Sequence, residues 1–328
     1  NSVSSSEHRD YHIKGDLGAL YIGSTKTLTF AKWNSKFGCV DGTPNTKTLI
    51  PCTESAQPEW CSDSSNGEIE IENIEIPSFI KSLPDYNFYG LPDLKTLNAP
   101  SVTSIGSYAF AYCKSLETLN VPNLKSIKSY AFNSCDSLRT LKINKNATSI
   151  GSYAFSECSN LQDVTCSSKT NKATVRIGSY AFSNCDALYR FNLPNAKTLG
   201  TCCFDKSPNL KYAYAPKARI DKHCFGVREQ SVVKAEVGSL NNYALENNTV
   251  IRTLILGNAK SIGNYALSGA TGVREIKAPK VTSVGSYAFK DTKLTSVYLN
   301  NVRNIGSYAF ANCKTIERAY LGTNISKV

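Results

Sequence analysis

One six-residue motif, Ile-Gly-Ser-Tyr-Ala-Phe, recurs along this chain of 328 residues. It occurs in full at 105–110, 150–155, 177–182 and 305–310, and in altered form elsewhere as IKSYAF, IGNYAL and VGSYAF. Self-similarity at a period of about 20 to 50 residues is the signature of a repeat architecture. The repeat therefore constrains the fold more than any other feature of the chain.

The fifth residue of the motif forms a column of small residues. Its members are Asn87, Ala109, Ala131, Ala154, Ala181, Cys203, Cys224, Ala244, Ala266, Ala288 and Ala309. Successive members lie 20 to 27 residues apart, which defines about eleven repeats from about residue 75 onward. Ala suits a position where two backbone segments approach closely, and Cys is a small apolar substitute for it.

Each repeat ends in an alternating segment, such as LETLNVP at 116–122. Its apolar residues Leu119 and Val121 would lie on one face and the polar residues between them on the other, as in a half-buried strand. A unit of this size cannot bury its apolar face alone, so we expect the copies to stack at about 4.8 Å per rung into a solenoid with one parallel β-sheet face. The Phe that ends each hexamer would form a buried ladder.

The full pattern, I-G-x-x-A-F-x-x-C-x-x-L-x-x-L-x-x-P, resembles the BspA-type leucine-rich repeat over about three quarters of the chain. The resemblance implies a right-handed leucine-rich-repeat solenoid, over residues 76–328, that is secreted or displayed on a cell surface. It also implies adhesion or ligand binding without catalysis. The copies at 200–204 and 220–225 depart from the pattern, and 231–237 lacks a clear strand motif, so we expect the middle of the rod to be its least regular part.

Residues 1–75 carry no repeat and differ in charge. They hold 6 Lys/Arg and 11 Asp/Glu, whereas the remaining residues hold 31 and 15. The segment alternates well enough for one or two strands and contains both tryptophans, Trp33 and Trp60. We expect it either to cap the first repeat or to form a small β-rich module with its own ligand. The basic remainder would attract acidic partners, unless its Lys and Arg side chains only solubilise the loops.

The 12 cysteines fall into groups. One group follows the ladder Phe by three residues and consists of Cys113, Cys135, Cys158, Cys185 and Cys313. We expect these to be buried free thiols, and not a metal site, because stacked side chains lie along a line instead of converging as a tetrahedron. In the leading segment, a disulfide between Cys52 and Cys61 is the nearest pairing and would indicate an oxidising compartment.

Catalysis has little support in the sequence. The three histidines are His8, His12 and His223. His223 precedes Cys224, but no third group is evident to orient a Cys–His nucleophile, and no nucleotide-binding motif is present. We expect no enzyme activity, no cofactor and no metal. The scattered basic residues match no nucleic-acid module, and no apolar run is long enough for a membrane span.

The outward face of the sheet is the expected binding surface, and it is formed by the third and fifth residues of each strand motif. Most of these positions in the early repeats hold Thr or Asn. Two clusters differ, one of Arg190, Tyr212 and Tyr214, and one of Tyr298, Arg318 and Tyr320. Exposed Tyr and Arg are typical of binding hot spots. Alternatively, Tyr is present there for its high strand propensity.

The expected function is non-catalytic binding or adhesion, outside the cell or on its surface, with a host, matrix or glycan macromolecule as the ligand. The alternative is a structural subunit that assembles end to end into a filament or surface layer, because the sequence stops directly after a strand motif and leaves an open rung. The same open rung is compatible with a native chain that continues past Val328.

Overall fold

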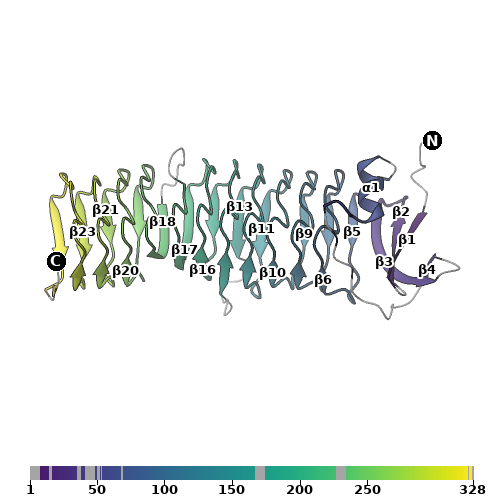
Figure 1. Cartoon of the computed structure of the whole chain (residues 1–328), viewed down its shortest axis with the longest axis horizontal. Helices are drawn as coiled ribbons and strands as arrows, with labels where there is room; N and C mark the ends of the chain where they lie inside the picture. The colour runs from purple at the N-terminus through teal and green to yellow at the C-terminus, as the bar shows by residue number, and fades with distance from the viewer. Residues whose placement is uncertain are drawn as a thin grey trace.

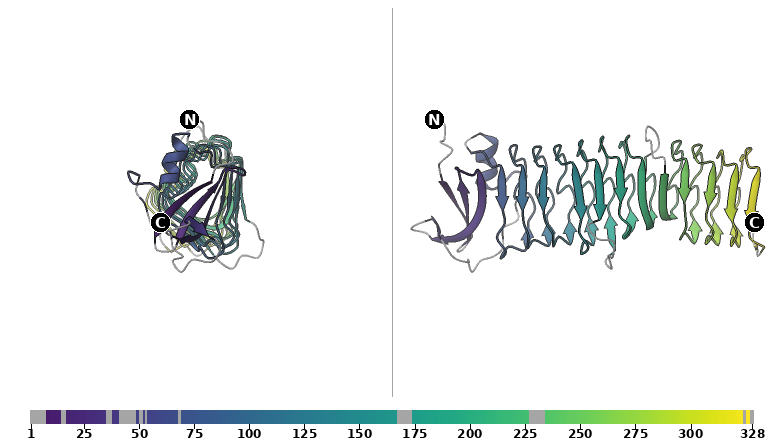
Figure 2. Two further views of the ribbon diagram at one scale, coloured as in Figure 1. Left: turned by 90° about the vertical axis from the view of Figure 1, so that its right-hand side faces the viewer. Right: turned by 180° about the vertical axis from the view of Figure 1, so that it is seen from behind.

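The computed structural model describes residues 8–14, 17–34, 38–40, 49, 52, 54–67, 69–166, 174–226, 234–323 and 325–326. They form a parallel β-solenoid of about eleven turns, preceded by a small antiparallel sheet and one short helix (Figure 1). The turns follow one another along a single long axis, and the view along this axis shows them superimposed (Figure 2). Side chains one repeat apart in the sequence are therefore neighbours in space.

Each turn contributes to two rows of parallel strands. The long row consists of β5 (Asn73–Glu75), β7 (Thr96–Asn98), β9 (Thr118–Asn120), β11 (Thr140–Ile143), β13 (Asp163–Cys166), β15 (Arg190–Asn192), β17 (Tyr212–Ile220), β18 (Lys234–Leu240), β19 (Thr253–Ile255), β21 (Glu275–Lys277), β23 (Ser296–Leu299) and β25 (Arg318–Leu321). The short row consists of β6 (Ser82–Leu83), β8 (Ser104–Ile105), β10 (Ser126–Ile127), β12 (Ser149–Ile150), β14 (Val175–Ile177), β16 (Ala196–Leu199), β20 (Ser261–Ile262), β22 (Ser283–Val284) and β24 (Asn304–Ile305). Equivalent residues pair, so Leu97 lies opposite Leu119 and Val164 opposite Phe191.

The long row is not continuous, which differs from the sheet expected from the sequence. β9 and β11 form no ladder in the part of the chain that the structure describes, although β8, β10 and β12 of the short row pair through the same repeats. The strands on either side of this break are regular. The solenoid itself is uninterrupted, because the turns and the short row bridge the break.

The predicted Phe ladder is confirmed. The rings of Phe88, Phe110, Phe132, Phe155, Phe182, Phe204 and Phe225 stack in sequence with centroid separations of 5.0 to 5.9 Å. All seven are buried. Leu245 and Leu267 then occupy the position, and a second stack joins Phe289 to Phe310 at 4.9 Å. These aromatic contacts supply a large part of the apolar surface that the solenoid buries.

The cysteine column lies directly behind this ladder. Each thiol donates to the carbonyl of the Phe one repeat earlier, as Cys113 Sγ does to Phe88 O at 3.1 Å and Cys158 Sγ to Phe132 O at 3.3 Å. Where the column holds Ser207, its hydroxyl makes the same bond to Phe182 O at 2.8 Å. The expectation of buried free thiols is confirmed for this group, with Cys313 half-buried. Their role is to satisfy carbonyls at the tight turn.

The motif tyrosines sit at a turn with left-handed backbone. Tyr153 has φ of 57°, and Glu157, four residues later, has φ of 62°. The same pair of positions is left-handed in most turns. This conformation is unfavourable for residues with a Cβ, and bonds between turns hold it, such as Tyr153 N to Ser179 O at 3.0 Å.

The middle of the rod contains long strands, although the pairing of β17 with β18 shifts register between Ala215 and Arg219. β17 and β18 each extend through both rows, and Lys234–Glu236 of β18 pairs with Tyr212–Tyr214 of β17 and with Thr253–Ile255 of β19. Residues 234–237, which lack a clear strand motif in the sequence, form part of β18, while 231–233 lie outside the described residues. The strand forms because Ala235 and Val237, both buried, supply the inward face.

The leading segment joins the first turn directly. β1 (His8–Lys14), β2 (Leu17–Ile22), β3 (Thr27–Asn34) and β4 (Gly38–Val40) form an antiparallel sheet, and β3 also pairs in parallel with β5 (Figure 1). Leu28 of β3 lies opposite Ile74 of β5. Helix α1 (Glu59–Ser65) places Trp60 beside Phe88, with ring centroids 6.3 Å apart. The Phe ladder thus ends against Trp60.

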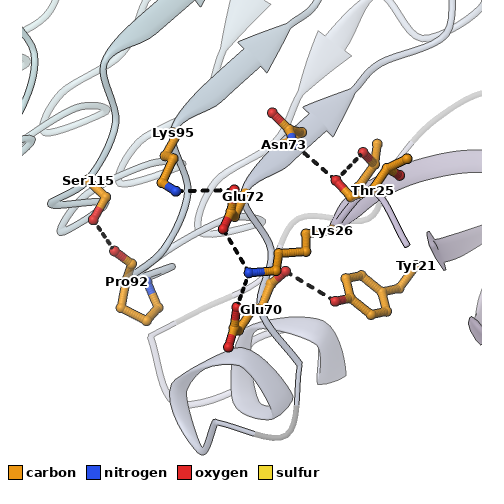
Figure 3. A network of polar contacts seen from close by, with 10 residues as sticks. Tyr21, Thr25, Lys26, Glu70, Glu72, Asn73, Pro92, Lys95 and Ser115 are labelled. Atoms are coloured by element: carbon orange, nitrogen blue, oxygen red, sulfur yellow. Dashed lines mark hydrogen bonds and ion pairs between the residues drawn. The ribbon is translucent and has the colours of Figure 1, made fainter. Parts of the chain in front are cut away.

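A polar network fastens the same junction (Figure 3). Lys26, in the turn between β2 and β3, contacts Glu70 and lies 2.9 Å from Glu72 Oε1, while Lys95 Nζ lies 3.1 Å from Glu72 Oε2. The hydrogen bonds from Lys26 and Lys95 lower the pKa of Glu72. Tyr21 donates to Glu70 O at 3.2 Å. The leading sheet is therefore tied to the first two repeats by charge as well as by strand pairing.

Candidate binding surfaces

The outward face of the long row has the composition expected from the sequence. In β11, Thr140 and Lys142 are exposed while Leu141 and Ile143 are buried, and most other strands of the long row alternate in the same way. Across β7 to β11 the exposed positions carry small or polar side chains. Large aromatic side chains on this face therefore stand out from their surroundings.

The first tyrosine cluster lies on β15 and β17 and consists of Arg190, Tyr212 and Tyr214, joined by Tyr189. Arg190 pairs with Tyr212 across the two strands. The exposed fractions of Tyr189, Tyr212 and Tyr214 are 48%, 46% and 41%, so about half of each side chain faces water. Arg190 Nε lies 2.8 Å from Asp163 Oδ1 on β13, the neighbouring strand on the other side of β15 from β17.

Tyr189 was not among the sequence-predicted residues. Its ring meets that of Tyr212 edge to face with centroids 5.5 Å apart, and a hydrogen bond between the two phenols raises the pKa of Tyr189. It is the second residue of its strand motif, where strict alternation predicts an inward side chain. The signal that could have identified it is the polar residue at that position in the neighbouring repeats, including Gln162 and Lys211.

The second tyrosine cluster consists of Tyr298, Arg318 and Tyr320 on β23 and β25. Tyr298 and Tyr320 stack with centroids 4.8 Å apart and planes 6° from parallel, so each ring covers one face of the other. Lys277 Nζ lies 5.8 Å from the centre of the Tyr298 ring. The structure therefore brings together the residues of each predicted cluster, and places the two clusters in different parts of the rod.

A third surface, on the turn side of the rod, contains the motif tyrosines. This turn-side groove has a volume of about 450 Å³, and its walls include Tyr108, Tyr130, Tyr153 and Tyr180. Their rings stack at 4.6 to 4.8 Å and hide most of their faces. Its floor hydroxyls bond to each other, with the Oγ atoms of Ser156 and Ser183 2.9 Å apart. These contacts favour a structural role for the motif tyrosines.

The two side chains that could have formed a nucleophile each have another partner, Glu246 for His223 and Cys203 for Cys224. Burial lowers the pKa of His223, whose Nε2 lies 3.3 Å from Glu246 Oε2. Cys224 is buried, and burial raises the pKa of its thiol well above the usual value, which suppresses the reactive thiolate. Within the described residues, no cluster of three or more His, Cys, Asp or Glu side chains could hold a metal ion.

The predicted Cys52–Cys61 disulfide is not formed in the structure. Cys61 is a free thiol, fully buried, with Sγ 3.4 Å from Asn87 O. Cys52 Sγ accepts a hydrogen bond from Asn87 Nδ2 at 3.3 Å. Both sulfur atoms thus contact the same residue of the first turn, and their pairing under oxidising conditions stays a prediction.

The stacked turns, the long row of parallel strands and the buried column of thiols together define a leucine-rich-repeat solenoid. The family described as "BspA type Leucine rich repeat region (6 copies)" matches residues 64–174, 103–231, 169–256 and 238–328. The chain belongs to this BspA-type leucine-rich repeat family. No curated protein sequence matches it.

The chain is similar to several solved structures at low sequence identity. A leucine-rich repeat protein from Eubacterium ventriosum is 17% identical, with 97% of this chain and 86% of that chain covered and a TM-score of 0.52. One from Bacteroides ovatus is 20% identical, with 96% and 90% covered and a TM-score of 0.48. A leucine rich cell surface protein from Faecalibacterium prausnitzii is 17% identical, with 97% and 96% covered and a TM-score of 0.44.

The seven-residue helix α1 is the only helix in the described part of the chain. No described helix has the length and apolar composition needed to cross a membrane.

Proposed function

We propose that this protein is a non-catalytic binding protein that recognises a macromolecule, a protein or a glycan, through the outward face of the long row. The observation that carries the proposal is the first tyrosine cluster, where three half-exposed rings and Arg190 interrupt a face of small polar side chains. Tyr and Arg are enriched at hot spots because both combine a large contact area with a polar tip. Strand propensity alone does not account for Tyr189, which precedes β15.

The chemistry of the cluster favours a ligand with acidic or hydroxyl groups. Arg190 and the phenols of the three tyrosines donate hydrogen bonds. The chain as a whole has a net charge of +11, which attracts anionic partners over a distance. The carboxylate of Asp163 partly neutralises the guanidinium of Arg190. An acidic group of the ligand would replace the Asp163 carboxylate at this guanidinium.

The leading sheet and α1 act, in this proposal, as a cap of the solenoid and not as a separate ligand-binding module. The pairing of β3 with β5 supports this role, because it covers the edge that the first strand of the long row would otherwise expose. The same pairing disfavours the alternative of end-to-end assembly through the first rung. We place the protein outside the cell or at its surface, on the basis of its membership in the BspA-type family.

The experiment is a binding screen against glycan arrays and extracellular matrix proteins, followed by variants. Replacing Arg190, Tyr212 and Tyr214 together by Ala should abolish binding to whatever ligand the screen identifies, without a change in melting temperature. The matched control replaces Thr96 and Asn98, on the same face of β7, by Ala. Unaltered affinity in the triple variant, or equal loss in the control, would contradict the proposal.

A further inference from the structure

The break in the long row leaves backbone groups facing one another across a slot. At the interface between β7 and β9, Thr118 N donates to Lys95 O at 3.0 Å. The corresponding bond from Thr140 N to Glu117 O is absent between these described residues, and no ladder joins β9 to β11. In a parallel ladder, the N–H and C=O groups of every second residue point toward the neighbouring strand on one side. The facing edges of β9 and β11 therefore have hydrogen-bonding groups available to a strand placed between them.

The break is confined to the two strands. Before it, Ser137 N donates to Lys114 O at 3.0 Å, and after it Thr148 N donates to Lys125 O at 2.7 Å. The stacked rings behind it are also intact. The slot is therefore a local opening in an otherwise bonded pair of repeats.

Apolar side chains line the slot. Its walls include Leu119, Val121, Leu124, Ile127, Leu141 and Ile143, around a cavity of about 20 Å³. Leu119 and Val121 are only partly buried, whereas Leu97 and Val164, at the Leu119 position in neighbouring repeats, are 0% exposed. A cavity of this size has room for about one water molecule. The slot is narrow, but it makes the apolar interior of the sheet accessible from the outward face.

The sequence contains a cause for the opening. Between β11 and β12 the chain reads INKNATSI, where the repeat containing β15 and β16 reads LPNAKTL, so Asn144 and Lys145 take the place of one Pro. Asn144 Nδ2 donates to Leu124 O at 2.6 Å, and Asn144 Oδ1 accepts from Asn146 N at 2.7 Å. These two bonds hold the longer connection in place.

We propose that the slot between β9 and β11 binds an extended segment of a partner protein, which enters as an additional strand. A strand satisfies both requirements of the site, because its backbone pairs with the two facing edges while alternate apolar side chains reach the core. A lipid chain would fill the apolar space but leave the backbone groups unpaired, which is costly once they are buried. An inserted strand needs about 4.8 Å on each side of it, and the absent bonds make this easier to reach than at a paired interface.

The charge around the slot adds a preference for the partner. Arg139, Lys142 and Lys145 are exposed on its β11 side and Lys125 on its β9 side, against Glu117. A segment with acidic residues at its outward-facing positions is therefore favoured. This site is separate from the first tyrosine cluster, and its existence does not depend on the function proposed for that cluster.

Backbone hydrogen exchange of the full chain is the first test. The amides of Thr140 and Val121 should exchange much faster than those of Thr118 and Ala99, their counterparts in the paired interface between β7 and β9. Equal protection at the two interfaces would show that β9 and β11 pair in solution, which would overturn the proposal.

A synthetic peptide with the sequence Ser-Leu-Glu-Thr-Leu-Asn-Val, taken from residues 115–121, is the binding probe. The peptide has the same alternation of apolar and polar residues as the strands of the long row. Its binding is followed by fluorescence anisotropy and should protect the amides of Thr140 and Val121 from hydrogen exchange. The matched control is the same peptide with N-methylated backbone at alternate residues, which should bind at least about tenfold more weakly because it lacks the donors. Failure of the first peptide to bind, or equal affinity of the two, would refute strand insertion.

A shortened variant, with Asn144→Pro and Lys145 deleted, restores the connection found after β15. It should gain protection at Thr140 and Val121 and lose affinity for the peptide by a factor of about ten or more. The variant Tyr212→Ala should bind the peptide as the unmodified protein does. If the shortened variant gains protection but binds the peptide equally well, the site lies elsewhere and the proposal fails.

Discussion

Phe110 and Phe132 stack with ring centroids 5.3 Å apart and planes 5° from parallel, although a full repeat of the chain separates them. Phe155 continues the stack beyond Phe132 at 5.2 Å. Each interior ring therefore has an aromatic neighbour in the repeat before it and in the repeat after it. The stability of one turn depends on side chains supplied by two others.

Truncation of an interior ring should be strongly destabilising. Phe132→Ala removes a buried ring from between two others and should lower the free energy of unfolding by about 3–5 kcal/mol, measured by urea denaturation. Tyr308→Ala is the control, because its side chain is 68% exposed. It should cost less than about 1 kcal/mol. Similar losses in the two variants would argue against the ladder as the core of the solenoid.

The left-handed backbone at the motif tyrosine predicts a difference between two substitutions that remove the same ring. Tyr153 has φ of 57°, a conformation that Asn tolerates and a β-branched residue does not. Tyr153→Val should therefore be less stable than Tyr153→Asn by about 1–2 kcal/mol in thermal or urea unfolding. Equal stability of the two variants would mean that the turn relaxes out of this conformation.

The buried thiols should make the protein sensitive to alkaline pH. Burial raises the pKa of Cys158 from 9.0 to about 12. Between these values the unfolded chain has lost the thiol proton while the folded chain retains it, so folding stability falls as pH rises from about 9 toward 12. Cys158→Ser keeps a donor for Phe132 O, as Ser207 does for Phe182 O, and removes the titrating group.

The measurement is melting temperature against pH for the two proteins. The difference between the unmodified protein and Cys158→Ser should be constant below pH 8 and change in favour of the Ser variant above pH 9. Parallel curves over the whole range would show that Cys158 is not the source of the sensitivity.

Trp60 tests the proposed cap. Its ring lies 6.3 Å from Phe88 and its Nε1 donates to Asn87 O at 2.9 Å. Trp60→Ala should cost about 3–5 kcal/mol, and hydrogen exchange should increase in β5 and β7 more than in β21 and β23, because repeats are stabilised by their neighbours. A uniform increase along the rod would contradict a local capping role.

The ion pair between Arg190 and Asp163 predicts that one substitution has little effect on stability and a measurable effect on binding. Both groups are partly exposed, with side chains 53% and 29% accessible, so Asp163→Asn should change stability by less than about 1 kcal/mol. The same change frees the guanidinium and should raise the salt concentration needed to elute the protein from heparin, used as an acidic probe. Arg190→Ala should lower the salt concentration needed for elution. Unchanged elution of both variants would exclude the cluster from contact with this probe.

The regular parts of the fold were predictable because each one depends on a single position in the repeat. The column of Phe residues predicts the buried ladder, and the Cys three residues later predicts the thiols behind it, since both follow from in-register stacking alone. The outward direction of Arg190, Tyr212 and Tyr214 follows from alternation within one strand. None of these required knowledge of how distant parts of the chain meet.

The features that were missed depend on how one repeat differs from its neighbours. β18 has the small residue Ala235 at the position where Leu119 stands in its own strand, so the strand was not recognised. The opening between β9 and β11 lies next to a connection with one additional residue, and the register of that turn could not be derived from spacing alone. The proximity of Cys52 and Cys61 to Asn87 depends on how α1 packs on the first turn, which no repeat position encodes.

The discontinuity between β9 and β11 also has a mechanical consequence. When the two ends of the rod are pulled apart, both rows of strands carry the load at most rungs. At this rung only the short row and the turns carry it. The rod is thus more compliant at this level, and bending there opens or closes the sheet side while the ring stack acts as the pivot. We therefore expect the described part of the rod to bend more easily at this level than at the rungs where both rows pair.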